Sequence, residues 1–274
     1  MSAPFPAYTD GAAPLRVDVQ TDAATMERLF QRTERCWRKQ GQTEPFWSVL
    51  SHDEFKRANF DSNAAEFWKT GPGEVQRMDA WLSRNGVDTA QFEACLELGC
   101  GVGRVTPWLA RRFRTVTACD ISPPHMELAK TEVANQGLGN VEFVLIGRLR
   151  AFDALPEIDA VYSVIVLQHN PPPVIREILH RVLRRLRPGG VAFFQVPTYA
   201  EGYQFDVQEY LTRPEHLEIE MHVIPQREIF DLAQASDCSV LEVEPDWCVG
   251  TPGWISHTFL VRKQRPGLLR RLLR

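Results

Sequence analysis

The sequence has no long apolar segment: no run approaches the roughly 18 residues that a membrane-spanning helix needs. Residues 1–10 contain no basic stretch followed by an apolar one, so we expect no secretory signal there. Basic residues are not in excess either, because 31 Lys and Arg stand against 35 Asp and Glu, a formal net charge of −4. Binding to nucleic acid depends on a basic surface, so we expect no nucleic-acid partner.

Cysteine pairs with Cys-x-x-Cys spacing are also missing. The six cysteines stand at positions 36, 95, 100, 119, 238 and 248, and several fall inside apolar, strand-like runs. This distribution favours buried free thiols and a reducing, cytoplasmic location. The histidines show no short metal-ligand spacing, so we predict no metal site.

What the chain does have is enough apolar residues for a sizeable core. It is 274 residues long, 44% hydrophobic and 10% aromatic, which indicates one large domain or one domain with an appendage. Residues 1–22 look like a loose arm. Helical spacing follows in 25–40 and 74–85, with an aromatic-rich segment and the Gly71-Pro72-Gly73 break between them. We therefore predict an N-terminal arm and helical lid region over 1–85 and a main domain over 86–274.

From residue 86 onward, short apolar runs alternate with amphipathic stretches. The expected strands are Ala94–Leu98, Val116–Cys119, Val141–Ile146, Ala160–Leu167, Val191–Val196, Ser239–Val243 and Thr258–Val261. The expected helices are Val105–Phe113, His125–Asn135, Val174–Leu186 and Arg227–Ala235. This alternation predicts an α/β fold, a doubly wound, mostly parallel sheet with helices on both faces. The stretch 198–224 is not needed to wind the sheet, and we expect a cap insertion there, over the carboxyl ends of the strands.

A glycine turn is the sharpest local signal. The apolar strand ending at Leu98 runs into glycines at 99, 101 and 103, and a helix is expected to begin near Val105. Glycine permits positive φ and close approach of a ligand, and a helix start offers unpaired N–H groups. Asp120 ends the next strand, where a carboxylate can accept both hydroxyls of a ribose. These features predict a nucleoside-containing cofactor, although a glycine turn used only for tight packing of a strand against a helix would have a similar sequence.

The residues around the turn discriminate between cofactors. The dinucleotide fingerprint needs a glycine where this chain has Arg104, and the phosphate-binding loop's Gly-Lys-Ser/Thr is absent. Glu97 stands just before the turn, where it would repel a phosphate but attract an ammonium and a sulfonium. This charge favours S-adenosylmethionine over a nicotinamide dinucleotide.

Four motifs carry a resemblance to a known family. ELGCGVGR (97–104), ACDIS (118–122), VLQHNPP (166–172) and VLRRLRPGG (182–190) occur in an order and spacing that resemble the class I S-adenosylmethionine-dependent methyltransferases. The resemblance implies a Rossmann-like methyltransferase fold with a seven-stranded sheet whose last strand is antiparallel. The resemblance also implies which residues contact S-adenosylmethionine. Its methionine end would contact Glu97, Gly99, Cys100 and Gly101, its ribose would contact Asp120, and its adenine would contact Ile121. Gln168 would lie beside the cofactor.

One departure concerns the adenine. Many members of the family have an acidic residue after the third strand, but this chain has Ile146-Gly147-Arg148 there. Either backbone groups hold the adenine, or Asp153 reaches back. A stretch at 66–77 also resembles one that precedes the glycine turn in some bacterial members, and we expect it to cover the cofactor or to supply packing aromatics.

Two histidines are candidates for catalysis. His169 follows Gln168 at the end of the fourth strand, and its titration range suits a general base. It would otherwise brace the proline turn that follows. His222 would come from the insertion, where substrate selection is expected, or would be an ordinary loop histidine.

The predicted function is methyl transfer to a hydroxyl or amine of a small molecule, such as a natural product, a sugar or a related metabolite. Protein and nucleic-acid acceptors are disfavoured because Gln168-His169-Asn170-Pro171 replaces the Asn/Asp-Pro-Pro-Tyr/Phe signature. The alternatives are another reaction or a regulatory role with the same cofactor, or a nicotinamide-dependent oxidoreductase. The basic, leucine-rich tail at 265–274 favours at most a weak contact with a membrane surface or a partner.

Overall fold

A computed structural model describes residues 15–265 of the protein, with the exception of residue 216. The tail beyond residue 265, for which a membrane or partner contact was predicted, lies outside these residues. Within the predicted loose arm, Arg16–Val17 form strand β1, which pairs in parallel with β7, Gln204–Phe205. The prediction of a loose arm is therefore wrong at these positions. Backbone pairing with a strand nearly 190 residues away leaves no local sequence pattern.

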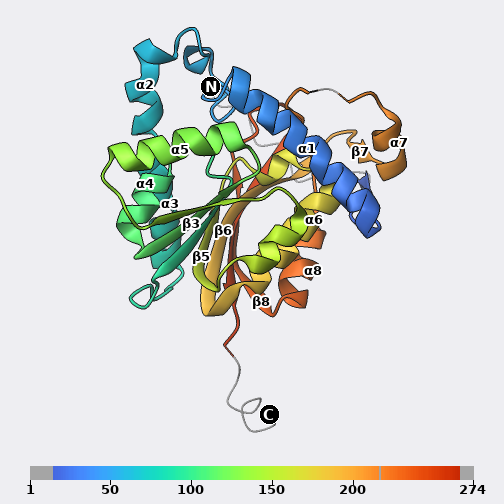
Figure 1. Cartoon of the computed structure of the whole chain (residues 1–274). Helices are drawn as coiled ribbons and strands as arrows, with labels where there is room; N and C mark the ends of the chain where they lie inside the picture. Colours follow the sequence, from blue (N-terminus) through green and yellow to red (C-terminus); the bar gives the residue numbers. More distant parts are fainter. Residues whose placement is uncertain (1–14, 216, 266–274) are drawn as a thin grey trace, which may run out of the picture.

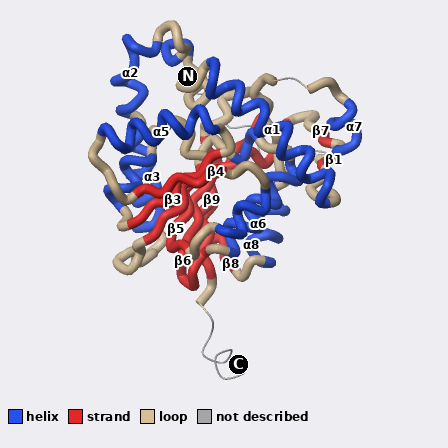
Figure 2. The backbone as a smooth tube through the Cα atoms, in the orientation of Figure 1, coloured by secondary structure: helices blue, strands red, loops and turns tan. Residues whose placement is uncertain are grey.

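A seven-stranded sheet forms the centre of the molecule (Figures 1 and 2). Its strand order is β4-β3-β2-β5-β6-β9-β8, and only β9 runs antiparallel to its neighbours. The strands are β2 Ala94–Leu98, β3 Thr115–Asp120, β4 Val141–Leu145, β5 Ile158–Ser163, β6 Leu186–Ala200, β8 Cys238–Asp246 and β9 Trp254–Lys263. The predicted doubly wound, seven-stranded, mostly parallel sheet with an antiparallel last strand is confirmed.

Helices cover both faces of this sheet, as the alternation of strands and helices predicts (Figure 1). One face packs against α3 Gly71–Arg84, α4 Thr106–Arg112 and α5 Pro123–Asn135. The other packs against α6 Pro172–Arg184 and α8 Gln226–Ala235, joined by the start of α1 Ala23–Thr43. Successive strand residues alternate between the two cores: Leu96 and Leu98 belong to one, and Cys95 to the other. Both faces of the sheet are therefore shielded from water, which explains why the strand sequences are almost continuously apolar.

Helix α1 carries the N-terminal region across the edge of the sheet, where it contacts both α5 and α6 (Figure 1). The helix begins at Ala23 because Asp22 caps its N-terminus: the Asp22 side chain accepts hydrogen bonds from the backbone N–H groups of Ala24 and Thr25. After α1 the chain passes through a short 3₁₀ turn, Asp53–Phe55, to α2, Phe60–Lys69. Phe46, Phe55, Phe60 and Phe67 pack together here. Phe67 thus supplies packing, one of the two roles expected of residues 66–77.

Two predicted boundaries are wrong. The helix expected over Val174–Leu186 ends at Arg184, and Pro188-Gly189-Gly190 lies within β6, because Leu186 already pairs with Ile158 of β5 before the register shifts. Gly71-Pro72-Gly73, expected as a break, forms the first turn of α3, where a proline needs no N–H donor. The break falls one residue earlier, at Thr70.

The expected cap insertion at 198–224 begins inside β6 and contains β7 and α7, Val207–Thr212. It lies beside α1 (Figure 1): the Arg32 guanidinium donates to the backbone oxygens of Tyr210, Arg213 and Pro214. The division of the chain near residue 86 stays a prediction. All six cysteines are free, and only Cys248 is not fully buried. Among residues 15–265, apart from 216, no helix is both long enough and apolar enough to cross a bilayer.

Candidate functional site

A cavity of about 920 Å³, part of it open to solvent, lies where β2, β3 and β5 end. Parallel strands bring their carboxyl ends to one edge, so side chains far apart in the sequence meet there. Six of the seven predicted cofactor residues line the cavity: Glu97, Gly99, Cys100, Gly101, Asp120 and Ile121. The N-terminal region contributes Trp37, Ser48 and Val49 to its walls. Residues 66–77 do not line it, so the covering role expected for them falls to the end of α1 and the turn that follows.

The glycine turn has the backbone shape that its sequence predicts. Gly99 has a φ of 76°, and a Cβ there would lie 2.4 Å from a methyl carbon of Val166. Gly101 has a φ of 54°, and a Cβ there would lie 3.0 Å from Val49. A side chain at either position would be strained and would fill the space between the turn and the cavity walls.

Asp120 supports this turn. One carboxylate oxygen accepts the N–H of Gly101 at 2.8 Å and the other accepts the N–H of Ser122 at 2.8 Å. A carboxylate has about four lone-pair positions, so two remain for hydroxyl donors from a ligand. Asp120 thus both braces the loop and presents acceptors to the cavity.

Glu97 is an unsatisfied acid in the wall of the cavity. It is 2% exposed, and its Oε2 has no hydrogen-bond partner among the described residues. Burial raises the pKa of this carboxyl to about 8, and the neighbouring Thr106 hydroxyl and Arg104 guanidinium offset that only in part. A buried acceptor without a donor costs free energy. A cationic ligand group would remove that cost.

Arg104 is a cavity residue for which sequence reasoning found no role. It is buried, it donates to Thr70 Oγ1 at 3.0 Å, and its Nη2 lies 3.9 Å from Glu74. Its Nε has no hydrogen-bond partner among the described residues. Tyr162, also in the wall, donates to Glu74 at 3.0 Å. The unused donor of Arg104 and the unused acceptor of Glu97 suit opposite ends of an amino acid. In the sequence, the position of Arg104 directly after the glycine turn was the signal from which its place in the cavity could have been predicted.

The remaining walls on the β3–β4 side are apolar. Ile121, Ile146 and Phe152 line the cavity there. Asp153 does not; its carboxylate pairs with Arg181 instead. Of the two arrangements left open for the adenine, the one in which Asp153 reaches back is therefore not supported.

A buried histidine ties the covering segment to the start of α5. His125 Nδ1 lies 2.7 Å from Ser122 Oγ, which donates to the backbone oxygen of Trp37 at 3.0 Å. Its Nε2 lies 2.8 Å from Ser48 Oγ, in the next turn of the chain. Burial lowers the pKa of His125, so the ring is neutral and links two segments that close the cavity. Isolated serines and a helical histidine give no pattern that predicts this contact.

Gln168 and His169 lie outside this cavity, in a buried chain of hydrogen bonds. Ile165 N donates to Gln195 Oε1 at 2.9 Å, and Gln195 Nε2 donates to Gln168 Oε1 at 3.0 Å. This order turns the Gln168 amide N–H toward His169 Nε2, at 3.3 Å. His169 therefore carries its proton on Nδ1, which donates to the Glu220 carbonyl at 2.9 Å. Both ring nitrogens are engaged, and burial lowers the pKa of His169 to about 4.

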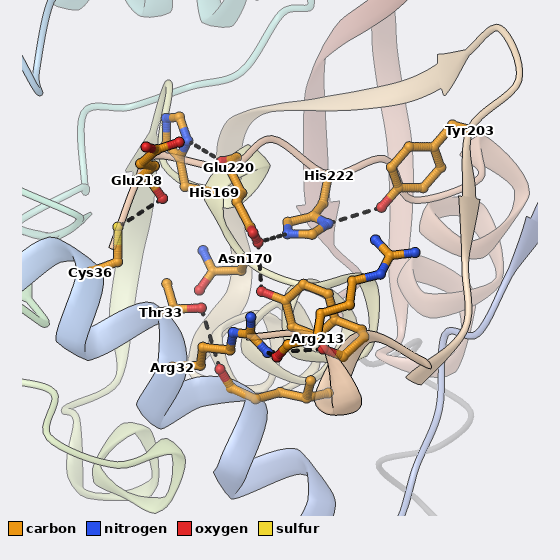
Figure 3. Close-up of polar contacts among 12 residues, drawn as sticks. Arg32, Thr33, Cys36, His169, Asn170, Tyr203, Arg213, Glu218, Glu220 and His222 are labelled. Atoms are coloured by element: carbon orange, nitrogen blue, oxygen red, sulfur yellow. Dashed lines mark hydrogen bonds and ion pairs between the residues drawn. The ribbon is translucent and has the colours of Figure 1, made fainter. Parts of the chain in front are cut away.

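His222 is buried in the insertion and does not line the cavity either (Figure 3). Tyr203 lies 3.0 Å from its Nδ1, and its Nε2 lies 3.4 Å from Glu220 Oε2. Its backbone N–H donates to the Gln168 carbonyl at 2.7 Å. The structure thus joins the two predicted histidines through Glu220, a residue for which sequence reasoning found no role.

Comparison with known proteins agrees with this geometry. A family model described as a methyltransferase domain matches residues 95–190. The chain is 32% identical over 166 residues to the ubiquinone biosynthesis O-methyltransferase of Caulobacter vibrioides, covering 54% of this chain and 64% of that protein. The chain is thus similar to methyltransferases over these residues. It is also 28% identical over 147 residues to the methyltransferase GfsG of Streptomyces halstedii, covering 50% of this chain and 52% of that protein. The matches span about half to two thirds of these relatives' lengths.

Solved structures share the fold of this chain at low sequence identity. The N-methyltransferase NodS of Bradyrhizobium japonicum superposes with a TM-score of 0.55 at 14% identity, covering 85% of this chain and 98% of that one. The [4+2]-cyclase SpnF superposes with a TM-score of 0.54 at 12% identity, covering 92% of this chain and 100% of that one. The fold alone therefore does not decide the reaction.

The residues present fit S-adenosylmethionine. Glu97 offers an unpaired carboxylate oxygen for an ammonium, and Arg104 an unpaired donor for a carboxylate. Asp120 offers free lone pairs for ribose hydroxyls, and the apolar walls suit an adenine. The glycine turn leaves the space between these groups open. In this arrangement Gln168 would act on the cavity only indirectly, through Gln195 and the turn at Ile165.

Proposed function

We propose that the protein transfers a methyl group from S-adenosylmethionine to a hydroxyl or amine of a small molecule. The observation that carries this proposal is the buried, unpaired carboxylate of Glu97 in the same cavity as the glycine turn. A pyrophosphate would meet repulsion from that acid, whereas an ammonium and a sulfonium would satisfy it.

When bound, the cofactor supplies a methyl group on a positively charged sulfur. The protein's own task is to orient the acceptor, exclude water and accept a proton where needed. Glu97 and Arg104 would hold the amino-acid end, Asp120 the ribose, and Ile121 the adenine. Cys100 and Gly101 would border the sulfur through their backbone. The covering segment, which includes Trp37 and Ser48, would exclude water.

The base role predicted for His169 and His222 calls for revision in this proposal. His169 Nδ1 donates to a backbone carbonyl, and Nε2 faces the Gln168 amide. Its pKa of about 4 makes it a poor proton acceptor at neutral pH. His222 is likewise placed between Tyr203 and Glu220. We therefore propose that both histidines position Glu220 and the segment that carries it.

The names of similar proteins support both kinds of nucleophile, because one relative is described as an O-methyltransferase and one solved structure as an N-methyltransferase. We infer a small-molecule acceptor rather than a nucleic acid, in keeping with the net charge of −4. The cytoplasm remains the location that we propose.

Calorimetry with S-adenosylmethionine, S-adenosylhomocysteine and NAD tests the cofactor. We expect both adenosyl compounds to bind and NAD not to bind; NAD binding alone would favour the oxidoreductase alternative. Transfer of a labelled methyl group to a panel of phenols, sugars and amines then tests the reaction. Tight cofactor binding without transfer to any member of a broad panel would favour the alternative of another reaction or a regulatory role.

A further inference from the structure

A second, smaller cavity lies next to the first, and Trp37 lines both of them. It spans about 280 Å³, part of it open to solvent, and is lined by Arg32, Thr33, Cys36, Trp37, His169, Tyr210, Glu218 and Glu220. The ring centroid of Trp37 lies 5.0 Å from that of His169. The walls come from α1, from the residues after β5 and from the insertion (Figure 3). A molecule in this cavity would therefore lie beside the cofactor cavity.

Most polar groups of this second cavity already have partners. The guanidinium of Arg32 donates to the carbonyls of Tyr210 and Pro214 and lies over the ring of Tyr210. The thiol of Cys36 donates to the Glu218 carbonyl, and burial raises its pKa to about 11. The cavity thus contains one engaged cation and the two carboxylates of Glu218 and Glu220, and its balance is acidic.

Glu220 is the carboxylate that the structure holds in place. Its Oε2 accepts from the Tyr210 hydroxyl at 2.6 Å and lies 3.4 Å from His222 Nε2. Both contacts reach Oε2, so neither occupies Oε1. Burial alone would raise the pKa of Glu220, but the hydrogen bonds from His222 and Tyr210 outweigh it and leave the pKa below its ordinary value. The group is therefore ionised at neutral pH.

The backbone around Glu220 is fixed as well. Its carbonyl accepts from His169 Nδ1, and the N–H of His222 donates to the Gln168 carbonyl. A half-buried carboxylate with an ordered backbone, whose Oε2 accepts from Tyr210 and faces His222, is set up to present its other oxygen to a ligand. Glu218, by contrast, is exposed at the rim.

We propose that the second cavity is the acceptor subsite and that Glu220 selects its occupant. The carboxylate favours an acceptor that presents an amine or a hydroxyl as hydrogen-bond donor and opposes one that presents a carboxylate or phosphate. The faces of Trp37 and Tyr210 suit an aromatic or cationic group beside that donor. This inference rests on the proposed function, because it assigns the site of the second substrate.

The test uses the full-length protein saturated with S-adenosylhomocysteine and three probes of one shape: tyramine, tyrosol and 4-hydroxyphenylacetate. They share a 4-hydroxyphenyl ring on a short side chain that ends in an ammonium, a hydroxyl or a carboxylate, and ligand-observed NMR measures their affinities. We expect tyramine to bind tightest and 4-hydroxyphenylacetate to bind at least about tenfold more weakly, because like charge is rejected at a partly buried site. Glu220→Gln should reduce that difference to within about threefold.

Glu218→Gln is the matched control, since it removes the same charge from the rim and should preserve the ranking. Tyr210→Phe removes a donor but no charge, and should also preserve it. Equal or tighter binding of the carboxylate probe, no binding of any probe, or a ranking lost in Glu218→Gln but kept in Glu220→Gln would overturn the proposal. S-adenosylhomocysteine affinity, measured first, separates the two questions: if the wild-type protein does not bind it, the proposed function fails, whereas normal binding in all variants isolates the acceptor subsite.

Discussion

The pH dependence of cofactor binding depends on Glu97. In the free protein, burial raises the pKa of this carboxyl to about 8, so at pH 7 about one molecule in eleven carries the charge. An ammonium bound against Glu97 favours the ionised form and lowers its pKa. Binding below about pH 8 therefore releases a proton, and the affinity must increase as the pH rises.

The size of this effect follows from the same pKa. Ionising Glu97 before binding reduces the affinity about 100-fold at pH 6 and about 11-fold at pH 7. We expect the affinity for S-adenosylhomocysteine to rise about ninefold between these two pH values. His125, the titratable ring in the same wall, has a pKa that burial lowers, and the variant Glu97→Gln, which leaves His125 in place, separates its contribution from that of Glu97.

Isothermal titration calorimetry in buffers of different ionisation enthalpy measures both the affinity and the protons released. Wild-type protein should release close to one proton per ligand at about pH 6.5. Glu97→Gln should bind more weakly, release no proton from this site and show a flat profile. An affinity that is independent of pH in the wild type, or a slope that survives in Glu97→Gln, would refute the reasoning.

Three further predictions concern the turn and the buried polar chain. Asp120→Ala should weaken S-adenosylhomocysteine binding by about 1–3 kcal/mol in calorimetry, because the loss of the carboxylate removes a charged acceptor and the brace on Gly101; unchanged affinity would remove Asp120 from the site. Gly99→Ala should abolish binding and lower the melting temperature more than Gly86→Ala, which meets the same left-handed backbone with φ of 62° but open space; equal effects would show that the contact with Val166 is unimportant. Gln195→Glu should reverse the Gln168 amide, protonate both nitrogens of His169 and raise its pKa from about 4; ¹⁵N NMR of the imidazole checks this, and an unchanged neutral Nδ1–H tautomer would contradict the hydrogen-bond order.

The predictions for the main domain succeeded because they depended on local patterns. The run Val191–Val196, for example, is buried along its whole length, as expected of a strand in a mostly parallel sheet that is covered on both faces. The glycine turn and Asp120 were found for a related reason. Their roles come from backbone conformation and from strand ends, which sequence position specifies directly.

Gln168 and His169 lie outside the cavity because of contacts between distant segments. His169 appeared free to act as a base, but its partners are the Gln168 amide and a carbonyl 51 residues further along the chain. Gln168 itself lies behind the cavity because Gln195, buried in β6, engages its amide. Neither contact leaves a spacing or a composition in the sequence from which it could be predicted.

The sequence by itself thus determined the order and type of the strands and helices, the glycine turn at 99–103, and the acid that directly precedes it. These features follow from hydrophobic period, glycine stereochemistry and charge, all of which act over a few residues. Only the tertiary structure decided which segment covers the cavity, which proton His169 holds, and that Glu220 lies beside Trp37. Those outcomes depend on packing the helix at 23–43 and the insertion against strand ends far away in the chain, and the free energies involved arise only when these surfaces meet.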